Sequence, residues 1–420
     1  MRAADTDPAD GGFDAVNGVD PAQPAARWSP ALLALSLLGA GALCALPLLR
    51  VAPNRLVSGE PVFFAALLQG PGSLQSYLMA GSLAAFMAAL LLAAFLKPHR
   101  AVLWAVVAVA CGLVNALVGL AGWQATLVAQ TAAAFGRTSL GSAFWAVLLL
   151  LGLVAADGLQ RLRAGSAARL AVVLTLLLPV GFMLAAGWCD ELSIMKEYAN
   201  RADVFGGVVA RHLQIVLLAL LFTLCIGLPL GWAAGKKSRF AGPLFPLLNI
   251  IQTIPSIALF GLLMAPLALL AARWPALARA GISGVGLAPA VIALTLYGLL
   301  PVVRATVAGL EQVPASVVNA ATGLGMTRAQ IFGRVELPLA LPVVLGGVRT
   351  ATIQAVGLAA VTALIGAGGL GAIMFEGLFS SAQDLVLLGV LPIIALGALA
   401  DAAFKGLIRL TRVSGSGVQP

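Results

Sequence analysis

The fold is decided around the stretch EQVPASVVNAATGLGMTRAQIFGRVELPLALP, residues 311–342, which is the least apolar part of the second half of the chain. Its pattern predicts two short helices. Gly325 suits the left-handed residue that ends the first helix, and Thr327 followed by Gln330 forms a capping box that begins the second. Pro338 constrains the residue before it and marks the return to apolar sequence. We expect a helical hairpin that projects from a membrane into water.

The sequence around this hairpin is too apolar for a chain that folds in water. Hydrophobic residues make up 61% of the 420 residues, charged residues 10%, and the mean hydropathy is +1.02, whereas a soluble domain is about 45–50% apolar. Apolar runs of about 20 residues match a bilayer as helices, while barrel strands would alternate over about 10 residues. The sequence predicts an all-α polytopic membrane protein. We expect about ten spans, at 30–49, 74–96, 101–122, 140–159, 167–188, 213–235, 244–270, 286–304, 346–366 and 385–404.

The excess of basic residues fits membrane topology better than nucleic-acid binding. The net charge is +9 and the isoelectric point is near 10. If the N-terminus is cytoplasmic, 17 of the 25 Lys and Arg residues fall on the cytoplasmic side of the ten spans, as the positive-inside rule requires. We therefore expect a multi-pass membrane protein, in contact with lipid, with both termini in the cytoplasm and no nucleic-acid partner.

Composition divides the chain into five regions. Residues 1–29 are predicted to be a disordered cytoplasmic tail, because they cannot bury a core. Residues 30–188 hold five spans that are poor in polar residues, so we interpret them as an accessory block; a role in regulation or partner binding is the alternative. Residues 189–211 are dense in charge and are expected to form a periplasmic linker. Residues 212–411 hold the remaining five spans and the hairpin, and 412–420 form a cytoplasmic tail.

The spacing of residues in the hairpin resembles a known signature. The hairpin is similar to the cytoplasmic loop of permease subunits of binding-protein-dependent ABC importers. The pattern that carries the similarity is Asn-Ala-Ala, three residues, Gly, nine residues and then Val-Glu-Leu-Pro. That loop usually begins Glu-Ala-Ala, and here Asn319 replaces the acid. The resemblance implies that the hairpin docks on the ATPase subunit; an ordinary amphipathic surface hairpin is the alternative. The implied coupling residues are Asn319, Ala320, Ala321, Gly325, Thr327, Gln330, Val335, Leu337 and Pro338.

Further motifs resemble one branch of this family. They are IQTIPSIALFG at 251–261, LYGLLPVVR at 296–304 and ALIGAGGLG at 363–371, and they are similar to permeases for glycine betaine, carnitine and choline. The resemblance implies a five-span type I importer core that moves a small osmolyte across the bacterial inner membrane. It also implies a cytoplasmic ABC ATPase dimer, a periplasmic substrate-binding protein and a second permease subunit, either a copy or a homologue. Permeases for amino acids or sulfonates share this core, so another small solute is the alternative.

Polar residues at depth in the spans are the candidates for the transport path. Gln252 and its neighbours interrupt the seventh span together with Pro255, and such groups are tolerated in lipid only where they face protein or a water-filled cavity. A kink satisfied by neighbouring helices, or a helix–helix hydrogen bond, is the alternative. The aromatic face of Tyr297 would favour a quaternary ammonium. The candidates are Gln252, Thr253, Pro255, Ser256, Tyr297, Gln354 and Thr362.

A glycine-rich stretch ends the ninth span. Its pattern fits a dinucleotide fingerprint, but it follows a membrane helix and not a strand, so we reject that function. We expect a flexible turn near the outer gate, made by Gly366, Gly368, Gly369 and Gly371.

The sequence carries little that could do chemistry. It holds no P-loop pattern, and its four cysteines lack a paired spacing. We therefore expect no catalytic residue, metal or cofactor, and ATP hydrolysis on a separate chain. An ion-coupled secondary transporter is less favoured because the core spans lack the carboxylates of an ion relay. A membrane enzyme is disfavoured because His, Asp, Glu and Cys do not cluster.

Overall fold

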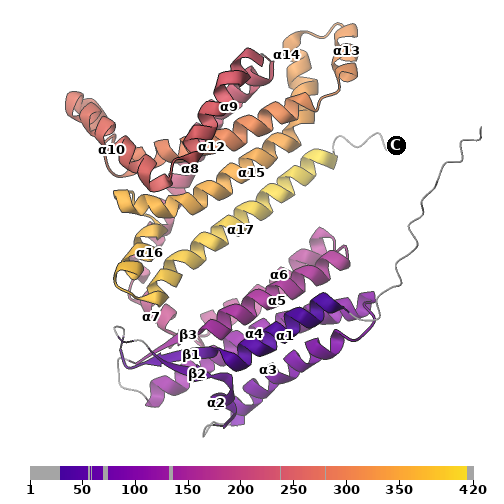
Figure 1. Ribbon diagram of the computed structural model, residues 1–420, viewed down its shortest axis with the longest axis vertical. Helices are drawn as coiled ribbons and strands as arrows, with labels where there is room; N and C mark the ends of the chain where they lie inside the picture. The colour runs from indigo at the N-terminus through magenta and orange to yellow at the C-terminus, as the bar shows by residue number, and fades with distance from the viewer. Residues whose placement is uncertain are drawn as a thin grey trace, which may run out of the picture. The chain divides into compact units, whose positions relative to one another are not determined.

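The structure is a computed structural model, and it describes residues 29–54, 57, 59–69, 74–131, 136–236, 238–279 and 281–413. The chain divides into two compact units, residues 1–53 with 58–192 and residues 54–57 with 193–420 (Figure 1). The predicted tails lie outside the described residues, apart from residue 29 of the first and residues 412 and 413 of the second.

The first unit, indigo to magenta in Figure 1, is a bundle of apolar helices. In it α4 packs against α3, α5 and α6, and α1 packs against α5. Leucines fill its interior, among them Leu83, Leu113 and Leu117, whose side chains are fully buried. The helices are α1 (Pro30–Ala45), α2 (Phe64–Gln69), α3 (Leu74–Ala93), α4 (Arg100–Thr131), α5 (Ser142–Arg161) and α6 (Ser166–Ala185).

The prediction of an all-α fold is confirmed, and the first unit adds one small three-stranded antiparallel sheet to its helices. Strand β1 (Pro47–Ala52) lies between β2 (Glu60–Phe63) and β3 (Arg137–Leu140). The first predicted span, 30–49, therefore ends early. Leu46 adopts an extended backbone, with φ −108° and ψ 152°, because the proline that follows it disfavours the helical conformation. The chain then continues as strand.

The number of membrane helices also differs from the prediction of about ten. Within the described ranges, eight helices are long and apolar enough to cross a membrane. The helix α1 and the described part of α3 are shorter apolar helices. The predicted seventh span, 244–270, is divided between α9 (Ser238–Thr253) and α10 (Ser256–Arg273), because the chain breaks at Pro255. The multi-pass prediction itself is confirmed.

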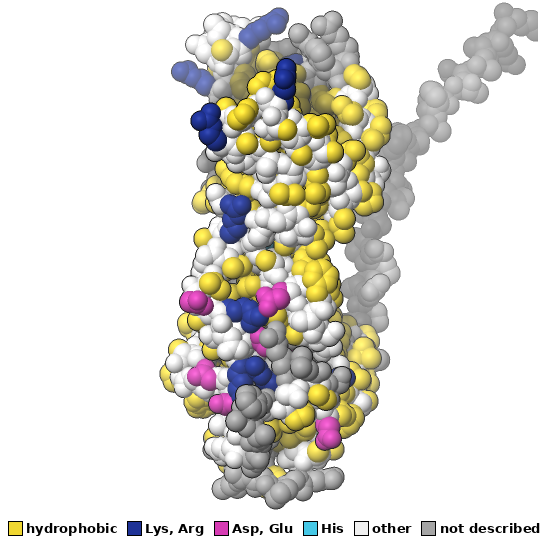
Figure 2. All heavy atoms as spheres, turned by 90° about the vertical axis from the view of Figure 1, so that its left-hand side faces the viewer, with side chains coloured by type: hydrophobic (Ala, Val, Ile, Leu, Met, Phe, Trp, Pro, Cys, Tyr) yellow, Lys and Arg dark blue, Asp and Glu magenta, His cyan; other side chains and the backbone are white. Residues whose placement is uncertain are grey.

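The helix surfaces are suited to contact with lipid. Large apolar side chains such as Leu178, Leu262 and Leu269 are more than half exposed. Figure 2 shows one face on which apolar side chains cover wide stretches, while charged side chains occur at a few separate places. In hydrocarbon such surfaces cost nothing to expose, and the helices satisfy their own backbone groups.

The second unit, magenta to yellow in Figure 1, is built around α12. This helix packs against α8 and α15 and is the most deeply buried candidate span. The elements besides α9 and α10 are α7 (Ser193–Ala199), α8 (Ala202–Lys236), α11 (Pro275–Arg279), α12 (Leu287–Glu311), α13 (Ala315–Gly323), α14 (Arg328–Ile331), the π-helical segment η1 (Phe332–Glu336), α15 (Leu337–Val361), the 3-10 helix η2 (Thr362–Ile365), α16 (Leu370–Phe379) and α17 (Gln383–Val413).

Candidate functional site

The predicted hairpin is present as α13 and α14, and its local structure confirms the reasoning from sequence. Gly325 has φ +76°, a left-handed conformation that favours glycine. The N–H of Met326 donates to the carbonyl of Ala321 at 3.2 Å, which completes a Schellman ending for α13. The capping box is also formed, since the Gln330 N–H donates to Thr327 Oγ1 at 3.4 Å and the Thr327 N–H donates to Gln330 Oε1 at 2.8 Å.

The second hairpin helix enters the next membrane helix without a loop. The segment η1 joins α14 to α15, and the Leu337 N–H donates to the carbonyl of Phe332. Pro338 lies in the first turn of α15 and has no N–H to donate, so an ordinary helical bond is missing there. The wider π turn accommodates this loss.

The hairpin presents an open surface. Within α13, Asn319 and Ala320 are exposed, whereas Ala321 is buried. Leu324 is 82% exposed, an unusual position for a leucine in water. Of the remaining predicted coupling residues, Gly325, Thr327, Gln330, Leu337 and Pro338 are exposed and Val335 is half-buried. A small, partly apolar surface of this kind suits contact with another protein.

Two contacts, which sequence reasoning missed, anchor the hairpin to the end of α8. Lys236 Nζ lies 2.5 Å from Glu336 Oε1, and the carboxylate side chain is only 8% exposed. The rings of Trp232 and Phe332 meet edge to face with centroids 5.9 Å apart. The sequence holds no signal for either pair, because their members are about 100 residues apart and belong to different helices. The base of the hairpin is thus tied to two membrane helices, α8 and α15.

The break in the predicted seventh span brings several candidate path residues together. Gln252, on the last turn of α9, donates from Nε2 to the carbonyl of Tyr297 on α12 at 2.5 Å. Gln354, on α15, donates from Nε2 to Gln252 Oε1 at 3.4 Å. The hydroxyl of Tyr297 donates to the carbonyl of Ile254. Three of the predicted residues, from three helices, therefore form one polar network.

The other candidate path residues lie outside this network. Thr253 and Pro255 are exposed at the break, and Ser256 is half-buried beside them. Thr253 Oγ1 donates to the carbonyl of Ile250 at 2.7 Å, within its own helix. Thr362 is fully buried and donates to the carbonyl of Ala359. The open face of the break is therefore made by residues 253, 255 and 256.

The glycine-rich turn lies at the opposite end of α15 from the hairpin. Gly366, Gly368 and Gly369 have φ of +77°, +82° and +78°. Gly371, which was predicted to belong to this turn, lies instead in the first turn of α16, two residues after Gly369. Arg211, on α8, donates from Nε to the carbonyl of Ala367 at 2.9 Å, and so joins α8 to the turn.

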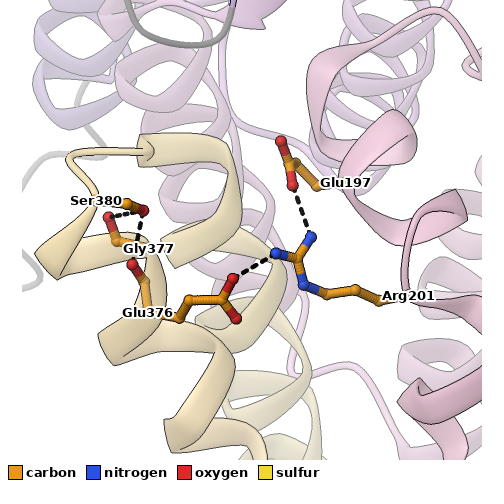
Figure 3. Close-up of polar contacts among 5 residues, drawn as sticks. All are labelled: Glu197, Arg201, Glu376, Gly377 and Ser380. Atoms are coloured by element: carbon orange, nitrogen blue, oxygen red, sulfur yellow. Dashed lines mark hydrogen bonds and ion pairs between the residues drawn. The ribbon is translucent and has the colours of Figure 1, made fainter.

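A second arginine, Arg201, also binds a neighbouring helix and is drawn in Figure 3. Arg201, just before α8, lies 2.8 Å from Glu197 on α7 and 2.6 Å from Glu376 on α16. The Glu197 side chain is 2% exposed and that of Glu376 is 54% exposed. Burial lowers the pKa of Arg201, but its hydrogen bonds to Glu376 and Glu197 and their charges outweigh burial and hold the pKa above its ordinary value. Arg201 therefore stays charged and joins three elements.

The described residues offer no group of three or more His, Cys, Asp or Glu side chains that could hold a metal ion. Their polar residues bind helices to one another and leave small exposed surfaces at the hairpin and at the break. Such an arrangement is suited to passing movement from one end of a helix bundle to the other.

Comparison with known proteins agrees with this arrangement. Residues 227–413 match the family described as "binding-protein-dependent transport system inner membrane component", and residues 26–195 match the N-terminal domain of the ABC transporter permease YehY. The osmoprotectant import permease OsmW of Salmonella typhimurium is 37% identical over 202 residues, which are 48% of this chain and 89% of OsmW. The glycine betaine/carnitine/choline permease OpuCD of Bacillus subtilis is 32% identical over 225 residues, which are 52% of this chain and 90% of OpuCD.

Among solved structures, a chain of the MetNI methionine ABC transporter in an inward-facing conformation is 23% identical, with a TM-score of 0.43, over 50% of this chain and 96% of that chain. The family match and the long alignments to OsmW and OpuCD show the family. The chain belongs to the family of ABC importer permeases, the inner membrane components of binding-protein-dependent transport systems.

Proposed function

We propose that this chain is the membrane subunit of an ATP-driven importer for a small osmolyte of the glycine betaine, choline or carnitine type. The hairpin carries the proposal. Its turn is defined on both sides, by left-handed Gly325 at the end of α13 and by the capping box at the start of α14. The hairpin is exposed at Asn319 and Leu324, and it continues into α15 without a loop. A separate motor protein that binds such a hairpin can move a membrane helix directly. The substrate class is supported by OsmW and OpuCD, whose names state it.

The proposed partners follow from the two ends of the permease unit. An ABC ATPase dimer binds the hairpin in the cytoplasm, since this sequence holds no P-loop pattern of its own. A periplasmic binding protein docks at the end that carries the glycine-rich turn, and a second permease subunit, a copy or a homologue, completes the pore. Both termini then lie in the cytoplasm, in agreement with the distribution of Lys and Arg. The N-terminal unit is an accessory block.

The proposed path follows the break between α9 and α10. Thr253 and Pro255 are exposed there, and Ser256 lies beside them. A broken helix with polar side chains is tolerated in hydrocarbon only where it faces protein or a water-filled cavity. The glycine-rich turn, held by Arg211, is placed at the outer gate.

An ion-coupled transporter is the alternative mechanism, and the charges of the permease unit do not favour it. Asp401, on α17, lies 2.7 Å from Lys405 and also pairs with Arg349 on α15. Glu336 pairs with Lys236. A carboxylate that relays protons or sodium ions has to lose and regain its partner, whereas these carboxylates hold helices together.

Reconstitution tests the proposal. Proteoliposomes that contain this chain, with an ATPase and a binding protein from the same genome, should take up radiolabelled glycine betaine, choline or carnitine only when both partners and ATP are present. A protonophore and a sodium ionophore should leave uptake unchanged. Uptake of methionine or a sulfonate in place of these osmolytes would assign another substrate. Uptake that needs an ion gradient and no ATP would overturn the proposal.

The path is tested separately, in a chain whose four native cysteines are replaced by serine. Cysteines at positions 253 and 256 should react with a small water-soluble thiol reagent more readily in one state of the ATP cycle than in another. If lipid-soluble reagents alone reach them in every state, this face of the break contacts lipid and the path lies elsewhere.

A further inference from the structure

The break between α9 and α10 leaves the backbone carbonyl of Ile254 without a helical partner. Pro255 has ψ 138° and stands before the first turn of α10. The first helical hydrogen bond of α10 runs from the Leu259 N–H to the carbonyl of Pro255 at 3.0 Å. The carbonyl of Ile254 comes one residue earlier and is not part of the helical hydrogen bonds of α10. The hydroxyl of Tyr297, on α12, donates to this carbonyl.

A second carbonyl is free on α12, for a related reason. In a helix the carbonyl of residue 297 accepts the N–H of residue 301, but that residue is Pro301, which has none. The side chain of Gln252, on α9, lies with Nε2 2.5 Å from the Tyr297 carbonyl oxygen. A carbonyl can only accept, so the amide nitrogen of Gln252 must face it. Gln354 fixes the same orientation, because it donates to Gln252 Oε1.

We propose that Gln252 and Tyr297 form a reciprocal clasp that positions the break between α9 and α10. Each side chain satisfies a backbone carbonyl that has no helical partner: Gln252 binds the carbonyl of Tyr297 on α12, and Tyr297 binds the carbonyl of Ile254, the residue after α9. Loss of either bond would leave a backbone carbonyl unsatisfied, which is costly for a group shielded from water. The clasp thus fixes where the broken helix lies against α12, and with it the exposed face that the proposed path follows.

The clasp gives Tyr297 a role different from that of an aromatic face for a cation. Its side chain is buried, with 4% of the residue exposed, and it packs in a core cluster with Phe260 and Leu294. Its hydroxyl and its own carbonyl are both engaged, at Ile254 and Gln252. Tyr297 is therefore a positioning residue, and the ring contributes packing.

A single-atom change separates these roles. Tyr297→Phe keeps the ring, so a cation bound on its face would still be held. The clasp requires the hydroxyl. We expect Tyr297→Phe to lower the melting temperature of the purified chain by about 2–4 °C. A second measurement, of uptake, rests on the proposed function. The maximal uptake rate should fall several-fold, while the substrate concentration at half-saturation stays unchanged.

A proline substitution tests the geometry of the clasp itself. Pro301→Ala gives residue 301 an N–H that can donate to the Tyr297 carbonyl, which makes Gln252 dispensable for that carbonyl. Gln252→Met, of similar length and without an amide, should lose stability. Gln252→Met/Pro301→Ala should recover most of that loss. Tyr297→Phe/Pro301→Ala is the matched control and should recover none, because the carbonyl of Ile254 gains nothing from residue 301.

The melting temperatures are measured on the full chain in detergent without ATPase or substrate, so they do not depend on the proposed osmolyte import. The clasp is supported if Pro301→Ala restores the melting temperature of Gln252→Met but not that of Tyr297→Phe. Recovery of both variants, or of neither, overturns it, as does a Tyr297→Phe chain that melts and transports like the wild type. If Gln252→Met accumulates too little to purify, the same comparison is made on the amount of each variant in the membrane.

Discussion

Replacing Lys236 by methionine should destabilise the permease unit more than replacing its partner Glu336 by glutamine. The two charges lie 2.5 Å apart, but the Glu336 side chain is 8% exposed and the Lys236 side chain 44% exposed. Lys236→Met leaves a buried carboxylate without this ammonium. Removing one partner of a fully buried pair costs about 3–5 kcal/mol, and because this lysine lies partly in water we expect about 2–3 kcal/mol. Glu336→Gln leaves a lysine that can turn into water, at a cost below about 1 kcal/mol.

Thermal unfolding of the purified chain measures this difference. For a unit of this size each kcal/mol lowers the melting temperature by about 2–4 °C, so Lys236→Met should lower it by about 4–12 °C and Glu336→Gln by less than about 4 °C. The double variant should be more stable than Lys236→Met alone, because glutamine is neutral. Arg161→Met is the control: its pair with Asp157 is 35% exposed on both sides, so its effect should be within about 1 kcal/mol.

Equal losses from the two single variants would refute this reasoning, since the asymmetry follows from the burial of one partner alone. A double variant no more stable than Lys236→Met would refute it as well, because the cost would then not come from the carboxylate.

Three further substitutions test other parts of the site. Gly325→Val should leave the protein in the membrane but reduce uptake and ATPase co-purification, because φ +76° disfavours a β-branched residue; normal uptake and co-purification would contradict the coupling assignment. Gly371→Ala should lower the melting temperature, since its Cβ would lie 1.9 Å from a carbonyl oxygen of α15, whereas Gly406→Ala, with nothing within 4 Å, should not. Glu376→Gln should weaken the hold of Arg201 on α16 by less than about 1 kcal/mol, and the loss should shrink as salt rises; a salt-independent loss would show that solvent does not screen this pair.

Local signals in the sequence predicted much of the second unit. The turn at Gly325 and the capping box of Thr327 and Gln330 depend on residues within a few positions of one another, so a single sequence suffices to find them. The break at Pro255 is equally local. The ion pair of Asp401 and Lys405, four residues apart on one helix face, is likewise local.

What sequence reasoning missed depends on residues that are far apart in the chain. Strand β3 pairs with β1 across three intervening helices, and its four residues, Arg137–Leu140, carry no apolar alternation. The bond from Gln252 to the Tyr297 carbonyl needs the knowledge that α9 lies beside α12. The sequence shows that Pro301 leaves one carbonyl of its helix free. It does not show which side chain binds that carbonyl.

The run from α14 through η1 and α15 to η2, residues Arg328–Ile365, contains 38 residues without a loop. At 1.5 Å per residue this rod is roughly 55 Å long, so a tilt of about 5° displaces one end relative to the other by about 5 Å. A flexible loop within this run would bend and would not pass such a displacement on. Here the hairpin and the glycine-rich turn lie at the two ends of one continuous helical run, whose main part, α15, packs against α12. Under the proposed function, a push on the hairpin would therefore move the glycine-rich turn as well.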